Sequence, residues 1–175
     1  MTSRRRSKRR GKTRRIRRQR GGNNDLLVNT GAPLPSEPVS VELNVRFQPN
    51  SVYSASETGN VLTKTNSRSQ PHVEWTHPPK GVMYTFLCWD PDASWLHWLV
   101  TNATGNGPET GEVITKWAPP TPPSGQHRYI FATFQQPTKL NLPANENRQN
   151  FNIAQFVQQH SLTPVSKYKG IRVNS

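Results

Sequence analysis

The sequence predicts a mainly β domain with a single helix near its C-terminus. Short apolar runs rich in β-branched and aromatic residues recur along the chain, and clusters of Pro and Gly separate them, as is typical of strands joined by turns. Apolar residues show convincing helical spacing in only one place, after residue 150. The 175 residues are enough for one domain with an appendage.

Composition divides the chain into four regions. Residues 1–22 form a basic arm that ends in two glycines, and residues 23–38 form a polar, Pro-containing linker. Residues 39–170 carry the regular hydrophobic patterns and are expected to form the domain, and residues 171–175 are expected to be a tail.

The clearest predicted strand opens the domain at residues 39–47, where apolar and polar residues alternate with the period of two that a half-buried strand shows. The runs at 82–89 and 128–134 are apolar almost throughout, so we expect them to lie centrally in a sheet and to be covered on both faces. Further strands are expected at 72–75, 97–102 and 112–116.

The predicted helix lies near the C-terminus. Four side chains follow the spacing of one helical face: Ile153, Phe156, Val157 and His160. Asn150 or Asn152 can cap the start of this helix, and Pro164 marks its end.

The net charge of +13 comes almost entirely from the arm. Residues 21–175 hold 11 Lys and Arg against all 10 Asp and Glu, a net charge of +1. Residues 1–20 hold no acidic residue and twelve basic ones: Arg4, Arg5, Arg6, Lys8, Arg9, Arg10, Lys12, Arg14, Arg15, Arg17, Arg18 and Arg20.

This arm predicts nucleic-acid binding. With Ile16 as its only large apolar side chain, it cannot bury enough surface to offset its ordering entropy, so we expect it to be disordered until it meets a polyanion. Guanidinium groups bind phosphate in pairs of hydrogen bonds and stack on bases, and we expect RNA rather than DNA as the partner. A nuclear localisation signal is compatible with the same residues, whereas a mitochondrial transit peptide would need an apolar helical face that the arm lacks.

The rest of the composition limits the cellular setting. The single cysteine, Cys88, excludes an intrachain disulfide, is typical of a reducing compartment and lies in an apolar run that predicts a buried thiol. No stretch reaches the length of about 20 apolar residues that a membrane span needs, so no transmembrane segment is expected. No apolar run follows the basic start, so we expect no secretory signal peptide.

Two clusters of residues could carry chemistry. In the first, Asp90 and Asp92 follow the apolar run at 82–89, and His97 begins the next run. In the second, a Pro-rich loop delivers His127 and Tyr129 into a strand. Such side chains can compose an anion pocket or an acid–base site, although Asp-Pro-Asp is also an ordinary turn sequence and both histidines could be structural. No spacing matches a known metal-ligand pattern, no serine lies in a nucleophile elbow, and no cofactor is expected.

These residues also resemble a known family. The order Tyr84-Thr85, Asp90-Pro91-Asp92-Ala93, then residues 97–102 (HWLVTN), then Gly125-x-His127-Arg128-Tyr129 is similar to the phosphatidylethanolamine-binding proteins, which include the Raf kinase inhibitor proteins. The resemblance extends over roughly residues 39–170 and takes in Gly59-x-x-Leu62, Pro71-x-Val73-x-Trp75 and Leu162-x-Pro164-Val165.

The resemblance implies a large central sheet packed on a smaller one, a C-terminal helix and a small anion pocket. By position, Asp90, His97, His127 and Tyr129 would line the pocket and Asp92 would shape its rim, with a phosphate-bearing group as ligand. The chain departs from the family at Ser94, where Pro is usual, at Leu96, where a polar residue is usual, and in a shortened loop before His97. The pocket is therefore expected to be either functional or vestigial.

A basic arm, a short linker and a compact β domain together resemble the architecture of small RNA virus coat proteins. The leading hypothesis from the sequence is therefore a non-enzymatic capsid protein that packages RNA through its arm and self-assembles, with an icosahedral shell as the candidate assembly. Such a protein would be found in the virion and in the host cytoplasm or nucleus. One alternative is a regulator of the phosphatidylethanolamine-binding type whose arm provides RNA binding or nuclear targeting. Another is a binder of phospholipid or nucleotide whose arm aids attachment to anionic membranes.

Overall fold

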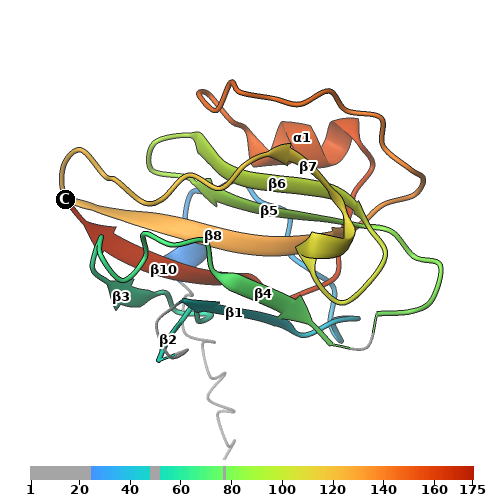
Figure 1. The fold of residues 1–175 in the computed structure, drawn as a ribbon, viewed down its shortest axis with the longest axis horizontal. Coiled ribbons are helices and arrows are strands. Elements are labelled where there is room, and N and C mark those ends of the chain that lie inside the picture. The colour runs from blue at the N-terminus through green and yellow to red at the C-terminus, as the bar shows by residue number, and fades with distance from the viewer. Residues whose placement is uncertain (1–24, 48–51, 77) are drawn as a thin grey trace, which may run out of the picture.

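The protein folds into two packed β-sheets (Figure 1). The computed structural model describes residues 25–47, 52–76 and 78–175, so the arm and its predicted disorder lie outside the described residues. The smaller sheet has the order β2-β1-β4, formed by β2 (Tyr53–Ser54), β1 (Leu43–Phe47) and β4 (His72–Trp75). Its register pairs Val45 with Val73 in antiparallel strands.

The larger sheet has seven strands. Its order is β3-β10-β8-β5-β6-β7, and β9 pairs with the end of β8. Only β3 and β10 run parallel to each other among the strand pairs of the described chain. The strands are β3 (Asn60–Leu62), β5 (Tyr84–Asp90), β6 (Trp95–Ala103), β7 (Glu112–Thr115), β8 (Gln126–Gln135), β9 (Thr163–Pro164) and β10 (Lys169–Asn174).

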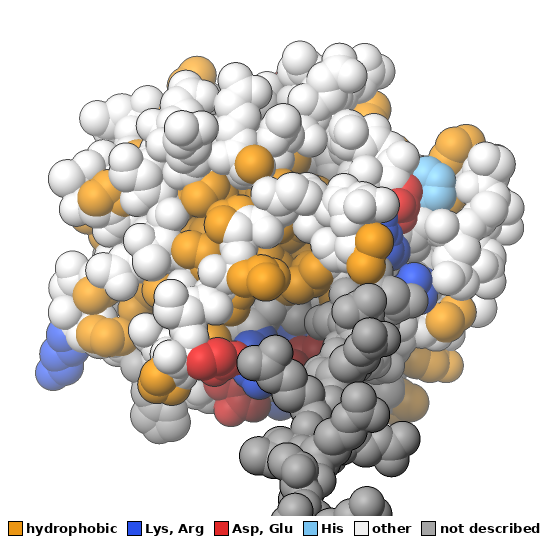
Figure 2. Space-filling view, turned by 180° about the vertical axis from the view of Figure 1, so that it is seen from behind, with side chains coloured by type: hydrophobic (Ala, Val, Ile, Leu, Met, Phe, Trp, Pro, Cys, Tyr) orange, Lys and Arg blue, Asp and Glu red, His pale blue; other side chains and the backbone are white. Residues whose placement is uncertain are grey.

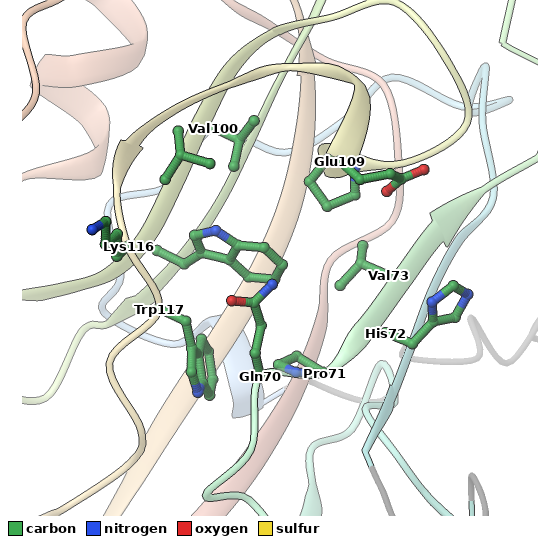
Figure 3. Close-up of a pocket in the computed structure, with 11 residues that line it drawn as sticks. Gln70, Pro71, His72, Val73, Val100, Glu109, Lys116 and Trp117 are labelled. Carbon is green, nitrogen blue, oxygen red and sulfur yellow. The ribbon is translucent and has the colours of Figure 1, made fainter.

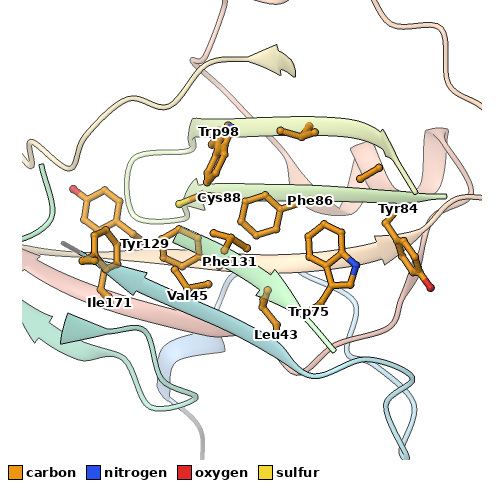
Figure 4. Close-up of a cluster of buried hydrophobic side chains, with 14 of the residues drawn as sticks. Leu43, Val45, Trp75, Tyr84, Phe86, Cys88, Trp98, Tyr129, Phe131 and Ile171 are labelled. Atoms are coloured by element: carbon orange, nitrogen blue, oxygen red, sulfur yellow. The ribbon is translucent and has the colours of Figure 1, made fainter. Parts of the chain in front are cut away.

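An aromatic core fills the space between the two sheets. Figure 4 shows Trp75 of the smaller sheet beside Phe86 of the larger one, and their rings stack with centroids 6.2 Å apart. Phe86 also meets the edge of Trp98 at 5.0 Å. Large aromatic side chains bury the most apolar area per residue, so this layer holds the sheets together.

The other face of the larger sheet is covered by α1 (Ile153–Gln159), by the short helix η1 (Asp25–Leu27) and by the segment between β8 and α1. Asn152 caps α1, because its side chain accepts the backbone N–H of Gln155 at 3.0 Å. Ile153 and Val157 point into the core, as the helical spacing predicts. A further short helix, η2 (Pro108–Thr110), precedes β7.

Strand β5 is central, as predicted. All seven of its residues are buried, and successive side chains alternate between the two layers: Phe86 and Cys88 face the smaller sheet, whereas Leu87 and Trp89 face α1. A strand covered on both faces has no solvent-exposed side, which explains its apolar sequence. The strand ends at Asp90, and this carboxylate therefore emerges from the most deeply buried part of the fold.

The C-terminal boundary differs from the expectation. Residues 171–175 are not a tail, because β10 pairs with both β3 and β8 in the interior of the larger sheet, and Ile171 and Val173 are fully buried. The alternation of apolar and polar residues in this strand is short and includes the charged Lys169 and Arg172. It therefore does not stand out from the sequence alone. The linker also contributes to the core, since Leu26 is fully buried.

Replacing Ile171 with Ala tests the role of β10. We expect Ile171→Ala to lower the free energy of unfolding by about 2–5 kcal/mol, because it leaves a cavity in a filled core. Val61→Ala on the adjacent strand is the matched control, since this side chain is 61% exposed and should cost less than about 0.5 kcal/mol. Equal urea midpoints for the two variants would show that β10 does not complete the core.

Candidate functional site

The site begins where β5 turns toward β6. The Asp90 side chain is buried, and its Oδ1 accepts the backbone N–H groups of Asp92 at 2.8 Å and Ala93 at 3.0 Å. Its Oδ2 lies 2.7 Å from Nδ1 of His127 on β8. A carboxylate oxygen only accepts, so the imidazole donates its Nδ1–H to Asp90. Asp90 thus holds both the turn and His127 in place.

His97 approaches the same place from β6. Its Nδ1 lies 2.7 Å from the carbonyl oxygen of Ala118, so this nitrogen carries the proton and donates it. The ring meets Tyr129 edge to face, with centroids 4.9 Å apart. Burial lowers the pKa of His97 below its ordinary value of 6.5, and the charges of Arg148 and His127 add to this effect, while the Ala118 hydrogen bond and Asp90 oppose it.

Asp92 is bound to Arg128 rather than to the histidines. The guanidinium group donates to both carboxylate oxygens, with a closest distance of 2.6 Å, and the backbone N–H of Arg128 adds a hydrogen bond of 2.8 Å. Burial alone would raise the pKa of Asp92, but the hydrogen bonds from Arg128 outweigh it and lower the pKa. Arg128 also donates to the carbonyl oxygens of Leu26 and Val28, so it ties the start of the described chain to the rim of the site.

Four of the five predicted site residues line one cavity of about 300 Å³, and Asp92 lies outside it. Burial raises the pKa of Tyr129, with further contributions from Asp90, Cys88 and Asp92, so its hydroxyl stays protonated. No sequence pattern indicated Trp95. The Pro-rich loop was recognised in the sequence, but its place in the wall of the cavity was not predicted. The cavity is lined by Asp90, Ala93, Trp95, His97, Thr121, Pro122, Pro123, His127 and Tyr129.

The departures from the family pattern have a structural counterpart. Leu96 points into the layer beneath α1, where an apolar side chain fits. The segment between β8 and α1 runs along the shortened turn, because the Leu96 N–H donates to the Arg148 carbonyl at 2.9 Å and the Phe151 N–H donates to the Ser94 carbonyl at 2.8 Å. This segment therefore supports the shortened turn from outside. Arg148 lies far from the motif in sequence, and no pattern indicated it.

A larger cavity, of about 720 Å³, is lined by residues of both sheets, and its Trp117 ring lies 6.4 Å from the ring of His97. Figure 3 shows Trp117 and Val73 on its walls, with His72 and Glu109 toward its rim. Trp98 also lines it and meets Trp117 edge to face at 6.0 Å. None of the predicted site residues lines this cavity, and its lining holds no close pair of acidic and imidazole groups comparable to Asp90 and His127.

The described residues contain no cluster of side chains suited to binding a metal ion. Among the described residues no group of three or more His, Cys, Asp and Glu side chains is arranged to hold a metal ion. Cys88 is fully buried, and burial raises the pKa of its thiol well above the ordinary value, with Asp90 adding to the effect. A thiol in this setting is a poor nucleophile.

No helix in the described part of the chain has the length and apolar character to cross a bilayer.

The two-sheet fold, with one helix on its outer face and a cavity at the end of β5, defines a class of β proteins, and the sequence pattern of one family matches this chain. The pattern of the phosphatidylethanolamine-binding proteins covers residues 52–167. The chain therefore belongs to the phosphatidylethanolamine-binding protein family, which confirms the resemblance and the fold expected from it. A phosphatidylethanolamine-binding protein from Plasmodium vivax has the same fold, with a TM-score of 0.64 at 17% identity over 86% of this chain and 96% of that one.

Other similar proteins differ in what their names say. A carboxypeptidase Y inhibitor, solved in complex with its cognate proteinase, has a TM-score of 0.65 at 16% identity over 78% of this chain and 84% of its own. "Putative odorant-binding protein A5" of Drosophila melanogaster is 33% identical over 129 residues, 63% of this chain and 61% of the fly protein. The "26 kDa secreted antigen" of Toxocara canis is 33% identical over 154 residues, 78% of this chain and 55% of that protein. The chain thus spans little more than half the length of these two relatives.

These comparisons correct the functional hypothesis. The expected capsid protein, with its self-assembly and virion location, is wrong, because the family match spans most of the domain and the relatives are an odorant-binding protein and a secreted antigen. The expected location in a host cytoplasm or nucleus is also wrong, because one of the relatives is named as a secreted antigen. The physical reason for the error is that a basic arm indicates a polyanionic partner but carries no information on assembly.

The buried, neutral His97 predicts a pH dependence of stability. The unfolded chain takes up a proton near the ordinary pKa of 6.5, whereas the native state takes it up only at lower pH, so the native state should lose stability as the pH falls from neutral toward about 5. The free energy of unfolding, measured with urea at a series of pH values, should fall less steeply with decreasing pH in His97→Gln than in wild type. His160, whose pKa burial also lowers, is more exposed, and His160→Gln should change the slope less. If His97→Gln kept the same pH dependence of the free energy of unfolding as wild type, His97 would not be its source.

Proposed function

We propose that the domain binds a small phosphate-bearing ligand in the cavity between Asp90, His97, His127 and Tyr129. The observation that carries the proposal is the convergence of a buried carboxylate, two imidazoles and a phenol from three neighbouring strands on one cavity. Members of this family are named for binding phosphatidylethanolamine, a lipid with a phosphate in its headgroup. A cavity of about 300 Å³ is at the small end of ligand sites, which suits a headgroup or a free phosphate compound.

The electrostatics support an anionic ligand despite two carboxylates nearby. Asp90 receives three hydrogen bonds and Asp92 is paired with Arg128, so neither presents an uncompensated charge to the cavity. The protonated hydroxyl of Tyr129 remains to donate to an anionic ligand, and Nε2 of His127 donates as well when the ring carries a second proton. Donors held in a partly dry cavity bind oxyanions more strongly than the same groups in water.

The proposed activity is binding without catalysis. Cys88 is a buried thiol whose pKa is raised, and in the part of the chain that the structure describes no hydrogen bond joins the Ser94 hydroxyl to an imidazole. Both histidines already donate one ring proton to a fixed acceptor, which suits orientation of a ligand.

The arm is proposed to add attachment to a polyanion, of which RNA is the class that its ten arginines favour. Its charge contrasts with that of the domain. On the face shown in Figure 2, Lys and Arg side chains lie in small, separate groups, some of them beside acidic side chains, and form no broad basic patch. Polyanion binding is therefore assigned to residues 1–22, and small-ligand binding to the pocket.

Calorimetric titration with O-phosphoethanolamine and with inorganic phosphate tests the pocket. His127→Ala should weaken binding about tenfold or more, because it removes a contact and leaves Asp90 buried without its imidazole partner. His72→Ala, on the rim of the larger cavity, is the control and should bind as wild type does. Unchanged affinity in both His127→Ala and His97→Ala would exclude this cavity as the ligand site.

Truncation of residues 1–22 tests the arm. The full chain should bind a mixed-sequence RNA with an affinity that falls steeply as salt rises, because bound counterions are released. The truncated chain should lose this binding and keep its affinity for phosphate. RNA affinity that survives truncation would show that the domain holds the polyanion, and preferential binding to anionic vesicles over RNA would replace the nucleic-acid assignment.

A further inference from the structure

Trp117 separates the two cavities of the domain. Its side chain lines the larger cavity, and its ring lies 6.4 Å from the ring of His97, which lines the smaller cavity. The consecutive residues His97 and Trp98 of β6 are divided in the same way, because Trp98 lines the larger cavity. Trp117 meets Trp98 edge to face, with ring centroids 6.0 Å apart. The two cavities are therefore adjacent and share an aromatic wall.

Arg148 holds this wall in place from the segment between β8 and α1. Its Nη1 donates to the carbonyl oxygens of Leu96 at 3.1 Å and His97 at 3.0 Å, and its Nη2 donates to the carbonyl oxygen of Lys116 at 2.7 Å. The planar guanidinium group thereby joins β6 to the residue immediately before Trp117. Because the backbone on both sides of the wall is fixed, both cavities keep their shape without a ligand, which lowers the cost of binding one.

The lining of the larger cavity suits an apolar group. Of the eleven described residues that line it, seven are apolar, and its volume of about 720 Å³ is within the usual range of ligand sites. Trp98 and Val100 are buried, whereas Val113 on the edge strand β7 is 52% exposed, so a ligand beside it would remove apolar surface from water. Figure 3 shows two of the polar lining residues, His72 and Glu109, away from the Trp117 wall. The four polar lining residues are all exposed: Gln70, His72, Glu109 and Lys116.

We propose that the larger cavity binds the hydrocarbon chain of an amphiphile whose phosphate group lies in the smaller cavity. The proposal rests on the proposed function, and it specifies the ligand as a single-chain phospholipid, a phosphodiester that carries one hydrocarbon chain. The diester oxygens only accept hydrogen bonds, and the hydroxyl of Tyr129 donates to them. Trp117 is partly exposed, so the chain crosses its outer edge between the two cavities.

The two cavities complement the two parts of such a molecule. In the smaller one a carboxylate, two imidazoles and a phenol converge, and these groups offer little to a hydrocarbon chain. In the larger one the chain passes from water to an apolar lining, and each buried methylene group adds to the affinity. Because the cavities share the Trp117 wall, one molecule can fill both, and the contact of the chain becomes intramolecular once the phosphate is bound.

Calorimetric titration with two phosphodiesters tests the chain site. Glycerophosphoethanolamine has no chain, and a lysophosphatidylethanolamine with a short acyl chain is used below its micelle concentration. Wild type should bind the lipid at least about tenfold more tightly, because several methylene groups leave water. Val113→Glu, which places a charge on the wall of the larger cavity, should remove most of this gain and leave the affinity for glycerophosphoethanolamine unchanged. Val61→Glu is the matched control, since Val61 is 61% exposed on β3, at the opposite edge of the same sheet, and should keep the full gain. Trp117→Ala is a second variant and should also reduce the gain.

The outcomes separate this inference from the function beneath it. Equal affinities of wild type for the two diesters would overturn the chain site while the smaller cavity remains a phosphate site. A gain that persists in full in Val113→Glu and in Trp117→Ala would place the chain elsewhere and would also overturn it. Lipid binding that His127→Ala leaves unchanged would show that the chain binds without the phosphate, against the joining of the two cavities. Failure of wild type to bind either diester would overturn both the inference and the proposed function.

Discussion

A buried carboxylate has to be satisfied where it lies, and the arrangement of the site follows from this requirement at Asp90. Burying an ionised group is costly unless hydrogen bonds replace its hydration. Strand β5 is covered on both faces and delivers Asp90 into the interior, where two backbone N–H groups and the imidazole of His127 surround it. The same three hydrogen bonds set the path of the turn and the place of His127, so one requirement of solvation shapes the whole cavity.

The parts of this arrangement that lie close together in sequence could be predicted. The apolar run ending at Asp90 indicated a central strand, and Asp-Pro-Asp indicated the turn. Because these motifs are local, the positions expected for the site residues could be carried over from the family one residue at a time. Asp92 was expected to shape the rim, and the structure pairs it with Arg128, whose distance of 36 positions in sequence made this partner impossible to identify from the local pattern.

Contacts between distant segments could not be predicted. Strand β10 reads as a tail because its burial comes from β8 and β3, whose pairing with it is invisible in the local pattern. Arg148 reads as an ordinary polar residue in a long connection, and its significance comes from three carbonyl oxygens on two other segments. The capsid hypothesis failed for a related reason: charge concentrated at one terminus describes the chemistry of a partner, whereas assembly depends on surfaces that composition does not describe.

A crystal structure of the chain grown with O-phosphoethanolamine, at a concentration above its measured dissociation constant, tests the central claim most directly. The account predicts phosphate density between Tyr129, His97 and His127. Density in the larger cavity beside Trp98 and Trp117, with the Asp90 cavity unoccupied, would contradict the assignment of the site.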